Sequence, residues 1–126
     1  MTEELAGQIR ALYTGRGLPV PPAIEGRIEV ASRVGRLEAL EAVELVKRRL
    51  VAGNALGPKL VQLIQFSQLL GIGHQQTASL HARAAMKEGA TVEELAAVAE
   101  LALITGGLPA YVMGMDILAG ILAEEK

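Results

Sequence analysis

The stretch from Leu69 to Glu94, LLGIGHQQTASLHARAAMKEGATVEE, decides the fold of this chain. Thr91 and Glu94 form a capping box: the threonine hydroxyl accepts from the backbone N–H of Glu94, and the Glu94 carboxylate accepts from the N–H of Thr91. A helix therefore begins at Val92. Gly89 supplies the left-handed residue that commonly follows a helix, so the preceding helix ends one or two residues before it. The stretch predicts two consecutive helices, and the first carries both histidines of the chain.

Apolar periodicity and helix-end residues predict further helices on both sides of this stretch. With the two above, the expected helices span about residues 2–13, 22–35, 37–51, 58–70, 74–87, 92–105 and 109–124. Three prolines within four positions interrupt the Gly15–Pro22 segment, which is either an extended connection across a neighbouring subunit or a plain loop. The side chains expected to face the core are Leu5, Ile9 and Leu12; Ile24, Ile28, Ala31 and Val34; Leu37, Leu40, Val43 or Glu44, and residues 46–50; and Leu60, Leu63, Ile64 and Leu70.

Length and composition favour one domain over residues 1–126 with a core of aliphatic side chains. The chain has 126 residues, of which 51% are hydrophobic, while only Tyr13, Phe66 and Tyr111 are aromatic. Such a core suits helices. The absence of cysteine excludes disulfides, thiolate metal sites and thiol redox chemistry. We expect no cofactor and no metal.

Charge and hydropathy argue against nucleic acid and membrane as partners. The formal net charge is −2 with acids and bases interspersed, which gives no basic surface for nucleic acid or anionic lipid. The longest uncharged run, Leu101–Met115, is shorter than the roughly 20 residues of a membrane span and is broken by glycine and proline. Because the acidic start of the chain lacks the pattern of a secretory signal, we expect a soluble cytoplasmic protein.

The last two expected helices are apolar on most of their circumference, and such helices must be buried on more than one side. In a domain this small, the second side is most economically another subunit. Gly114 and Gly120 would permit close approach of helices there. The apolar positions are Leu95, Val98, Leu101, Leu103 and Ile104, followed by Val112, Met113, Met115, Ile117, Leu118, Ile121 and Leu122.

Several short motifs between about Leu56 and Leu122 resemble the carboxymuconolactone decarboxylase family, which also contains the AhpD-like peroxidases. They are Gly57-Pro58-Lys59, Leu80-His81-Ala82-Arg83-Ala84-Ala85, Gly89-Ala90-Thr91, Glu93-Glu94-Leu95 and Gly106-Gly107-Leu108-Pro109-Ala110. The resemblance implies an all-α, AhpD-like bundle of about six to seven helices. It also implies a homo-oligomer, either a trimer or a hexamer built from trimers, which would assemble through the apolar C-terminal helices.

The same resemblance locates a candidate site. The AhpD-like branch has a glutamate, a Cys-x-x-Cys pair twelve residues on, a histidine four residues after the second cysteine, and a glycine eight residues further. Counted back from Gly89, the histidine falls on His81, the cysteines on Thr77 and His74, and the glutamate on Gln62. Only the histidine is kept. The decarboxylase branch also lacks the cysteine pair, so the loss argues against thiol peroxidase chemistry and not against that branch.

His81 is the candidate proton-transfer residue, because a free imidazole has a pKa of about 6.5, near working pH. The alternative is a core histidine hydrogen-bonded to a carbonyl or to Gln62. His74 is a second candidate catalytic residue or a surface histidine. Both lie on one side of their helix with Thr77, but their Cα atoms are about 10.5 Å apart along the axis, too far to share one metal ion.

Further residues are candidates for binding a substrate, or else have ordinary structural roles. Gln62, Thr77 and Tyr111 are candidate substrate-binding residues. The glutamines around Gln62 line an interface or a cleft, or else form a solvated face, and Thr77 orients a ligand or bonds to its own helix. Arg83 projects to a different face from His81 and is expected in an ion pair or a subunit contact.

Two functions remain open. The first is a cofactor-independent enzyme that uses His81 in proton transfer on a small carboxylated or carbonyl substrate, although no cation lies on this helix face to hold an anion. The alternative is a non-catalytic oligomer that binds a small molecule or serves a structural role. A redox partner of a peroxiredoxin is disfavoured by the residues at positions 74 and 77.

Overall fold

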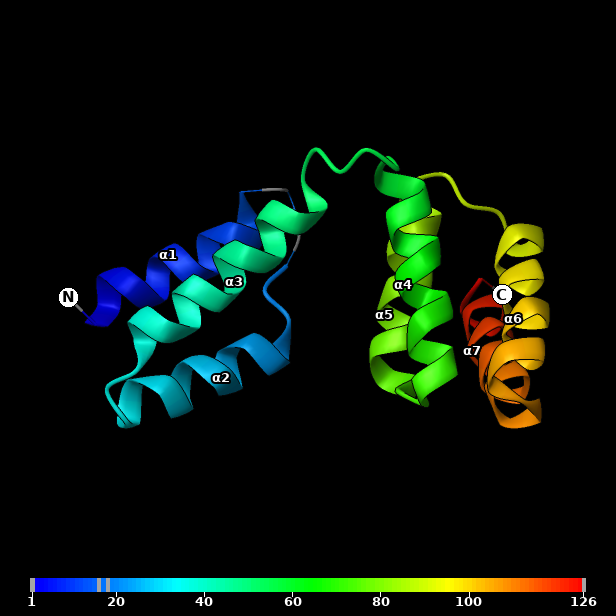
Figure 1. Ribbon diagram of the computed structural model, residues 1–126. Coiled ribbons are helices and arrows are strands. Elements are labelled where there is room, and N and C mark those ends of the chain that lie inside the picture. The colour runs from blue at the N-terminus through cyan, green and yellow to red at the C-terminus, as the bar shows by residue number, and fades with distance from the viewer. Residues whose placement is uncertain (1, 16, 18, 126) are drawn as a thin grey trace. The chain divides into compact units, whose positions relative to one another are not determined.

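The computed structural model describes residues 2–15, 17 and 19–125, and within this part of the chain the regular structure is helical, with seven helices and no strand. The all-α prediction is confirmed. Of the proline-rich connection, Arg16 and Leu18 lie outside the described residues, and residues 15, 17 and 19–21 form no helix. The helices are α1 (Thr2–Thr14), α2 (Pro22–Arg33), α3 (Leu37–Val51), α4 (Pro58–Ile72), α5 (Gln75–Lys87), α6 (Val92–Gly106) and α7 (Leu108–Glu124), labelled in Figure 1.

The helices form two compact units. Unit 1 is Met1–Gly53 and contains α1 to α3, whereas unit 2 is Asn54–Lys126 and contains α4 to α7. Each unit has a hydrophobic cluster of its own. The expected single domain over residues 1–126 stays a prediction.

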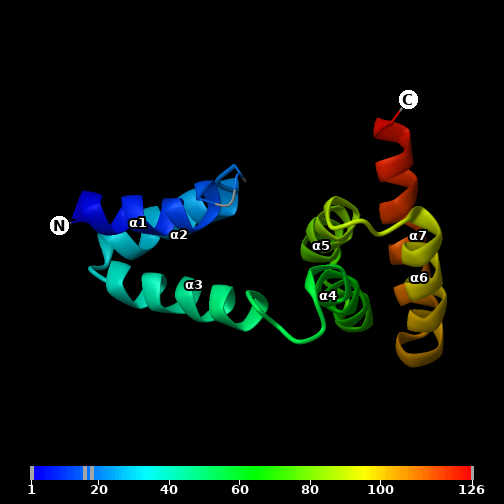
Figure 2. The same ribbon diagram turned by 90° about the horizontal axis from the view of Figure 1, so that it is seen from above.

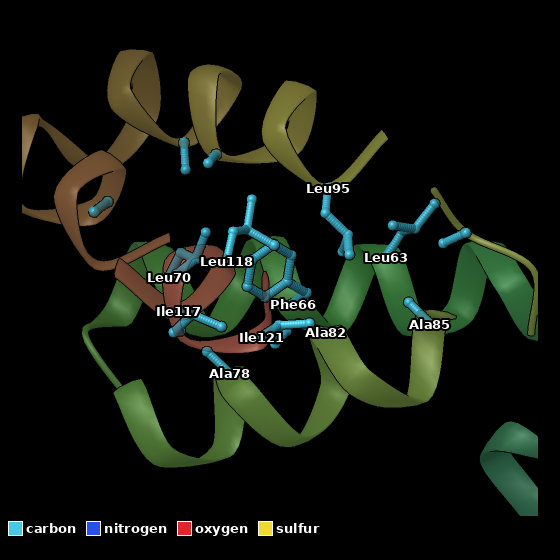
Figure 3. Packing of buried hydrophobic residues seen from close by; sticks show 14 residues of the cluster. Leu63, Phe66, Leu70, Ala78, Ala82, Ala85, Leu95, Ile117, Leu118 and Ile121 are labelled. Carbon is cyan, nitrogen blue, oxygen red and sulfur yellow. The ribbon is translucent and has the colours of Figure 1, made fainter. Parts of the chain in front are cut away.

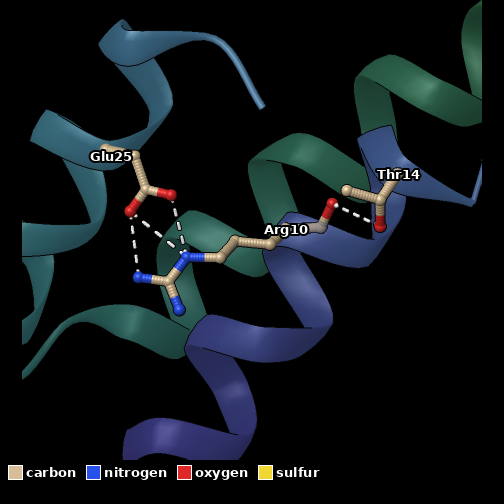
Figure 4. Close-up of polar contacts among 3 residues, drawn as sticks. All are labelled: Arg10, Thr14 and Glu25. Atoms are coloured by element: carbon tan, nitrogen blue, oxygen red, sulfur yellow. Dashed lines mark hydrogen bonds and ion pairs between the residues drawn. The ribbon is translucent and has the colours of Figure 1, made fainter. Parts of the chain in front are cut away.

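Unit 1 is a three-helix arrangement in which α1 and α2 pack against α3 and against each other. Its buried side chains are Ala6, Ile9, Ile24, Ile28, Ala31 and Leu37, whereas Val34, expected inside, is exposed. Arg10 of α1 faces Glu25 of α2 with two parallel hydrogen bonds of 2.8 and 2.9 Å (Figure 4). Both partners are well exposed, so this fork fixes the direction of α2 on α1 more than it stabilises the unit.

A buried carboxylate lies in α3 where an apolar side chain was expected. Of the two alternatives, Val43 is 56% exposed and Glu44 only 4%. The hydroxyl of Tyr13 donates to Glu44 at 2.9 Å, and Lys47 Nζ lies 2.8 Å from its other oxygen. Burial alone would raise the pKa of Glu44, but the hydrogen bonds from Lys47 and Tyr13 and the nearby charges of Lys47 and Arg27 lower it below its ordinary value. Glu44 therefore joins α1 to α3 as a charged group.

Unit 2 consists of two helical hairpins, α4 with α5 and α6 with α7, as both ribbon views show (Figures 1 and 2). Phe66 and Leu70 of α4 meet Leu95 of α6 and Leu118 of α7 in its core, and alanines of α5 close one side (Figure 3). The small alanines Ala78, Ala82 and Ala85 allow α5 to approach α4 closely. The prediction for α4 was partly wrong: Leu60 and Ile64 are exposed, whereas Val61 and Phe66 are buried with Leu63 and Leu70.

The helix ends of unit 2 follow local chemistry. The capping box of Thr91 and Glu94 is present, and Gly89 has a φ of +98°, as the deciding stretch predicts. The end of α4 was placed two residues too early, because α4 continues to Ile72 and ends at Gly73, which is left-handed. Only Gly73 and His74 then connect α4 to α5. This short connection makes the two helices antiparallel neighbours.

The α6–α7 hairpin buries one face and exposes another. A Cβ atom on Gly114 would lie 2.8 Å from Ala99 Cβ, so glycine there permits close packing, whereas one on Gly120 would meet nothing within 4 Å. The exposed apolar side chains of the hairpin are Leu101, Leu103, Ile104, Leu108, Val112, Met115 and Leu122. None of the described helices combines the length and apolar character needed to cross a lipid bilayer.

Candidate functional site

Two contacts set the register between α4 and α5. Nδ1 of His81 lies 2.6 Å from Oε1 of Gln62, and the backbone N–H of His74 donates to the carbonyl of Leu69 at 2.9 Å. From the first contact to the second, the chain advances seven residues along α4 and goes back seven residues from His81 to His74, which lies just before α5, as an antiparallel pair requires. We call the line of contact between these helices the α4–α5 seam. This hydrogen bond is the one expected if His81 is a core histidine bonded to Gln62, and the role of His81 in proton transfer stays a prediction.

The side-chain oxygen of Gln62 determines which ring nitrogen of His81 carries the hydrogen. The side-chain oxygen of Gln62 can only accept, so Nδ1 of His81 donates its hydrogen. In a neutral imidazole, Nε2 is then the basic nitrogen. Both residues are half-buried. The pair therefore holds an oriented histidine at the edge of the core, where general acid–base chemistry or a purely structural hydrogen bond is chemically feasible.

Gln65 adds a third polar group to the seam and is not among the predicted site residues. Its Oε1 is buried and has no hydrogen-bond partner among the described residues. Gln65 lies one turn after Gln62 on the same side of α4, and the register of the seam places it level with Ala78, one turn before His81. The i, i+3 spacing of the two glutamines is the only signal of this arrangement in the sequence.

His74 and Thr77 are both exposed. His74 is the residue just before α5, so the helix begins one residue later than predicted. Its side chain makes no capping hydrogen bond. The spacing of three, four and seven residues still puts His74 and Thr77 on the same flank of α5 as His81. The structure thus joins Gln62 to His81 and leaves the other two along the outer rim of the seam.

Tyr111 is not brought to His81 within the chain. Tyr111 lies near the start of α7, where it packs against the core cluster of unit 2. The far end of α7 is the one near His81, since Glu124 is bonded to Arg83 at 2.8 Å. Thirteen residues of helix, about 20 Å at 1.5 Å per residue, separate Tyr111 from Glu124. Its role in binding a substrate stays a prediction.

The cations nearest the seam are engaged elsewhere. Arg83 forms the predicted ion pair, with Glu124. Lys59 of α4 lies 2.9 Å from Glu94 of α6. The pKa of Glu94 is lowered first by the backbone N–H of Thr91 in the capping box and then by Lys59, so this pair is charged at neutral pH. Within the described residues, no three histidine, aspartate or glutamate side chains are grouped so that they could hold a metal ion.

An apolar groove of about 650 Å³ lies in unit 1, between α2 and α3. Its lining is mostly alanine, valine, glycine and leucine, with Arg27 and Arg36 as the charged members. None of the predicted site residues lines it. The groove and the seam are separate features, and only the seam carries residues suited to proton transfer.

The fold and the site define a class of protein. It is an all-α chain with two antiparallel helical hairpins and a histidine–glutamine pair across the first hairpin. The chain matches the carboxymuconolactone decarboxylase family over residues 38–119, and it belongs to that family. The match begins in α3, earlier than the Leu56 estimated from the motifs, so it includes part of unit 1 as well as most of unit 2.

Similarity to one relative extends over most of both chains. The chain is 22% identical over 88 residues to the uncharacterized protein MJ1511 of Methanocaldococcus jannaschii, and these residues cover 70% of this chain and 82% of the relative. No solved structure matches the chain. The comparisons therefore give the family and no activity.

Proposed function

We propose that this chain is a cofactor-independent enzyme of the carboxymuconolactone decarboxylase family, which uses His81 for proton transfer on a small carboxylated or carbonyl substrate. The supporting observation is the 2.6 Å contact between His81 and Gln62. These two residues occupy the positions where the AhpD-like branch has its histidine and glutamate. Gln62 is uncharged, so it orients the imidazole ring without adding a counter-charge of its own.

The proposed step begins at a carbon next to a carbonyl group. Nε2 of His81 takes the proton, the electron pair of the broken C–H bond moves toward the carbonyl oxygen, and the imidazolium returns the proton to carbon. For a β-keto carboxylate, His81 starts protonated by solvent: the bond to the carboxyl carbon breaks, its electron pair moves toward the carbonyl oxygen, carbon dioxide leaves, and the imidazolium gives its proton to the enolate carbon and is protonated again by water. Both sequences balance without an oxidant, a reductant or a metal.

Hydrogen–deuterium exchange into simple carbonyl compounds tests the proposal while the natural substrate is unidentified. Acetylacetone, methyl acetoacetate and acetoacetate would be incubated with the protein in D₂O, and loss of the C–H signal followed by proton NMR. We expect protein-dependent exchange or decarboxylation for at least one probe, and a loss of about 10² to 10⁴-fold in rate for His81→Gln. His74→Gln is the matched control, because it removes an exposed histidine from the same flank.

The alternative is a non-catalytic oligomer that binds a small molecule or has a structural role. The exposure of His74 favours it, because the predicted pair of histidines is not gathered in one enclosed site. It requires that none of the probes reacts, and that His81→Gln only lowers the melting temperature. Full retention of exchange in His81→Gln would likewise remove the catalytic role.

We also propose assembly of the chain through α6 and α7, as a trimer or as a hexamer built from two trimers. The exposed apolar side chains at the turn between these helices support it, since Ile104 is 78% and Leu108 62% exposed in the isolated chain. Large apolar side chains exposed in this way are typical of interaction sites when they adjoin one another.

A further inference from the structure

We infer that Gln65 is a specificity-determining residue of the α4–α5 seam and that the site selects uncharged carbonyl compounds with an N–H or O–H donor over carboxylate anions. This inference rests on the proposed site at His81. The class includes carboxamides, hydroxyketones and enols. It narrows the substrate beyond the carboxylated or carbonyl compounds named above.

Gln65 has a hydrogen-bond acceptor that is not used within the described part of the chain. Its Oε1 is buried without a hydrogen-bond partner among the described residues. A buried acceptor left unpaired costs about 1–3 kcal/mol, so such atoms in folded proteins usually have a reason. An amide oxygen can pair only with a donor. A carboxylate ligand has no hydrogen to offer and would bring its own negative charge against this oxygen.

Gln65 lies three residues after Gln62 on α4, which corresponds to about 4.5 Å along the axis. Gln65 is therefore close along α4 to the residue that orients the imidazole of His81. A compound that donates to Gln65 can therefore reach His81 with a neighbouring carbon. Gln65 as a residue is half-buried, whereas its Oε1 is itself buried, so a donor has to enter the seam to reach this oxygen.

The charges of the two helices also bear on the choice of ligand. Helices α4 and α5 carry three lysine and arginine side chains, Lys59, Arg83 and Lys87. The first two are bonded to Glu94 and Glu124, and Lys87 is exposed in the last turn of α5. When His81 is neutral, as abstraction of a proton requires, an anionic substrate would have to be desolvated beside two neutral glutamines without a cation to compensate it, which is unfavourable. A neutral donor avoids this cost.

The test compares three probes of nearly equal shape, benzamide, benzoate and N,N-dimethylbenzamide. Benzamide is neutral and donates, benzoate is anionic, and the dimethyl compound is neutral without a donor. Binding to the full chain would be followed by NMR at the ring C–H groups of the two histidines, assigned with His74→Gln. We expect benzamide to shift the His81 signal in a saturable way and the other two to bind at least tenfold more weakly.

Substitution at position 65 then locates the donor. Gln65→Leu removes the acceptor and keeps the volume, so it should weaken benzamide about tenfold, the loss expected for one hydrogen bond. It should keep or raise the melting temperature, because it removes an unpaired buried group. Gln65→Met serves if the leucine variant does not fold. Gln68→Leu, an exposed glutamine on the same helix, is the matched control and should bind as the original chain does.

The outcomes separate this inference from the proposed function. Three results would overturn the inference. They are binding of benzoate as tight as that of benzamide or tighter, an affinity for benzamide that is unchanged by substitution of Gln65, and the absence of any shift of the His81 signal with each probe at its solubility limit. If benzamide binds as expected but no probe exchanges its proton in D₂O, the catalytic proposal fails and the inferred specificity stands. If proton exchange depends on His81 but not on Gln65, the catalytic proposal stands and the inferred specificity fails.

Discussion

Gly114 of α7 packs directly on Ala99 of α6, so closely that a Cβ on the glycine would lie 2.8 Å from the alanine Cβ and 3.0 Å from a methyl carbon of Leu70. Gly114→Ala should therefore destabilise unit 2 by about 1–3 kcal/mol through overpacking. Urea denaturation measures the change. An unaltered unfolding midpoint would show that the hairpin relaxes around the methyl group.

Gly120→Ala on the same helix is the matched control. A Cβ there meets nothing within 4 Å, and alanine favours the helix over glycine by about 0.5–1 kcal/mol. The variant should therefore be slightly more stable than the original chain. A loss of stability instead would indicate that Gly120 lies in a contact between subunits.

The buried Glu44 should make unit 1 sensitive to acid. The pKa of Glu44 is lowered in the folded chain, so its contribution is complete above its ordinary pKa of about 4.3 and is lost as pH falls through that value toward the folded pKa. At pH 7, Glu44→Gln should cost about 1–3 kcal/mol, as expected for hydrogen bonds to a charged group. The difference between the two proteins should shrink as the solution is acidified.

Amide hydrogen exchange in α1 to α3 measures this effect where it arises. Other carboxyl groups with lowered pKa, such as those of Glu25 and Glu124, also respond to acid, but they are present in both proteins and cancel in the comparison. A difference between the two proteins that stays constant from pH 7 to below 4 would contradict the role of the Glu44 charge.

Assembly through the α6–α7 hairpin predicts a mass of three or six chains in light scattering at micromolar concentration. Ile104→Glu places a charge on the most exposed apolar side chain of that hairpin and should reduce the mass toward that of one chain. Val34→Glu, at an exposed apolar site in unit 1, is the control and should leave the mass unchanged. A monomer for the original chain removes the proposal.

Thiol peroxidase activity should be absent. Reduction of a hydroperoxide by this route needs a thiolate to attack and a second thiol to resolve the product, and the chain has no cysteine. The metal-free protein with a dithiol reductant should consume no alkyl hydroperoxide beyond the rate of the reductant alone. Turnover that depends on protein concentration would refute the argument.

The helix boundaries could be predicted because they depend on neighbouring residues. The capping box at Thr91, the glycine at position 89 and the proline at the start of α4 each act within one turn. The end of α4 was misplaced because Gly71 was taken as the start of the connection. In the folded chain Gly71 stays helical, and only Gly73 takes the left-handed conformation.

The burial of individual side chains was harder to predict, because it depends on distant partners. Glu44 can be buried partly because Tyr13, 31 residues earlier, donates to it in addition to the nearby Lys47. On α4, the contact of Gln62 with His81 followed from the antiparallel hairpin. The orphaned oxygen of Gln65 did not, since it depends on which side of α4 the neighbouring helix covers.

The separate cluster of unit 1 has a consequence for synthesis of the chain. All of its buried side chains, from Ala6 to Leu37, come from the first third of the sequence. Translation proceeds from the amino end at about 5–20 residues per second, so these side chains are available several seconds before the last turn of α7 exists. The first three helices can therefore shelter their apolar faces while α6 and α7, the most apolar helices of the chain, are still being made.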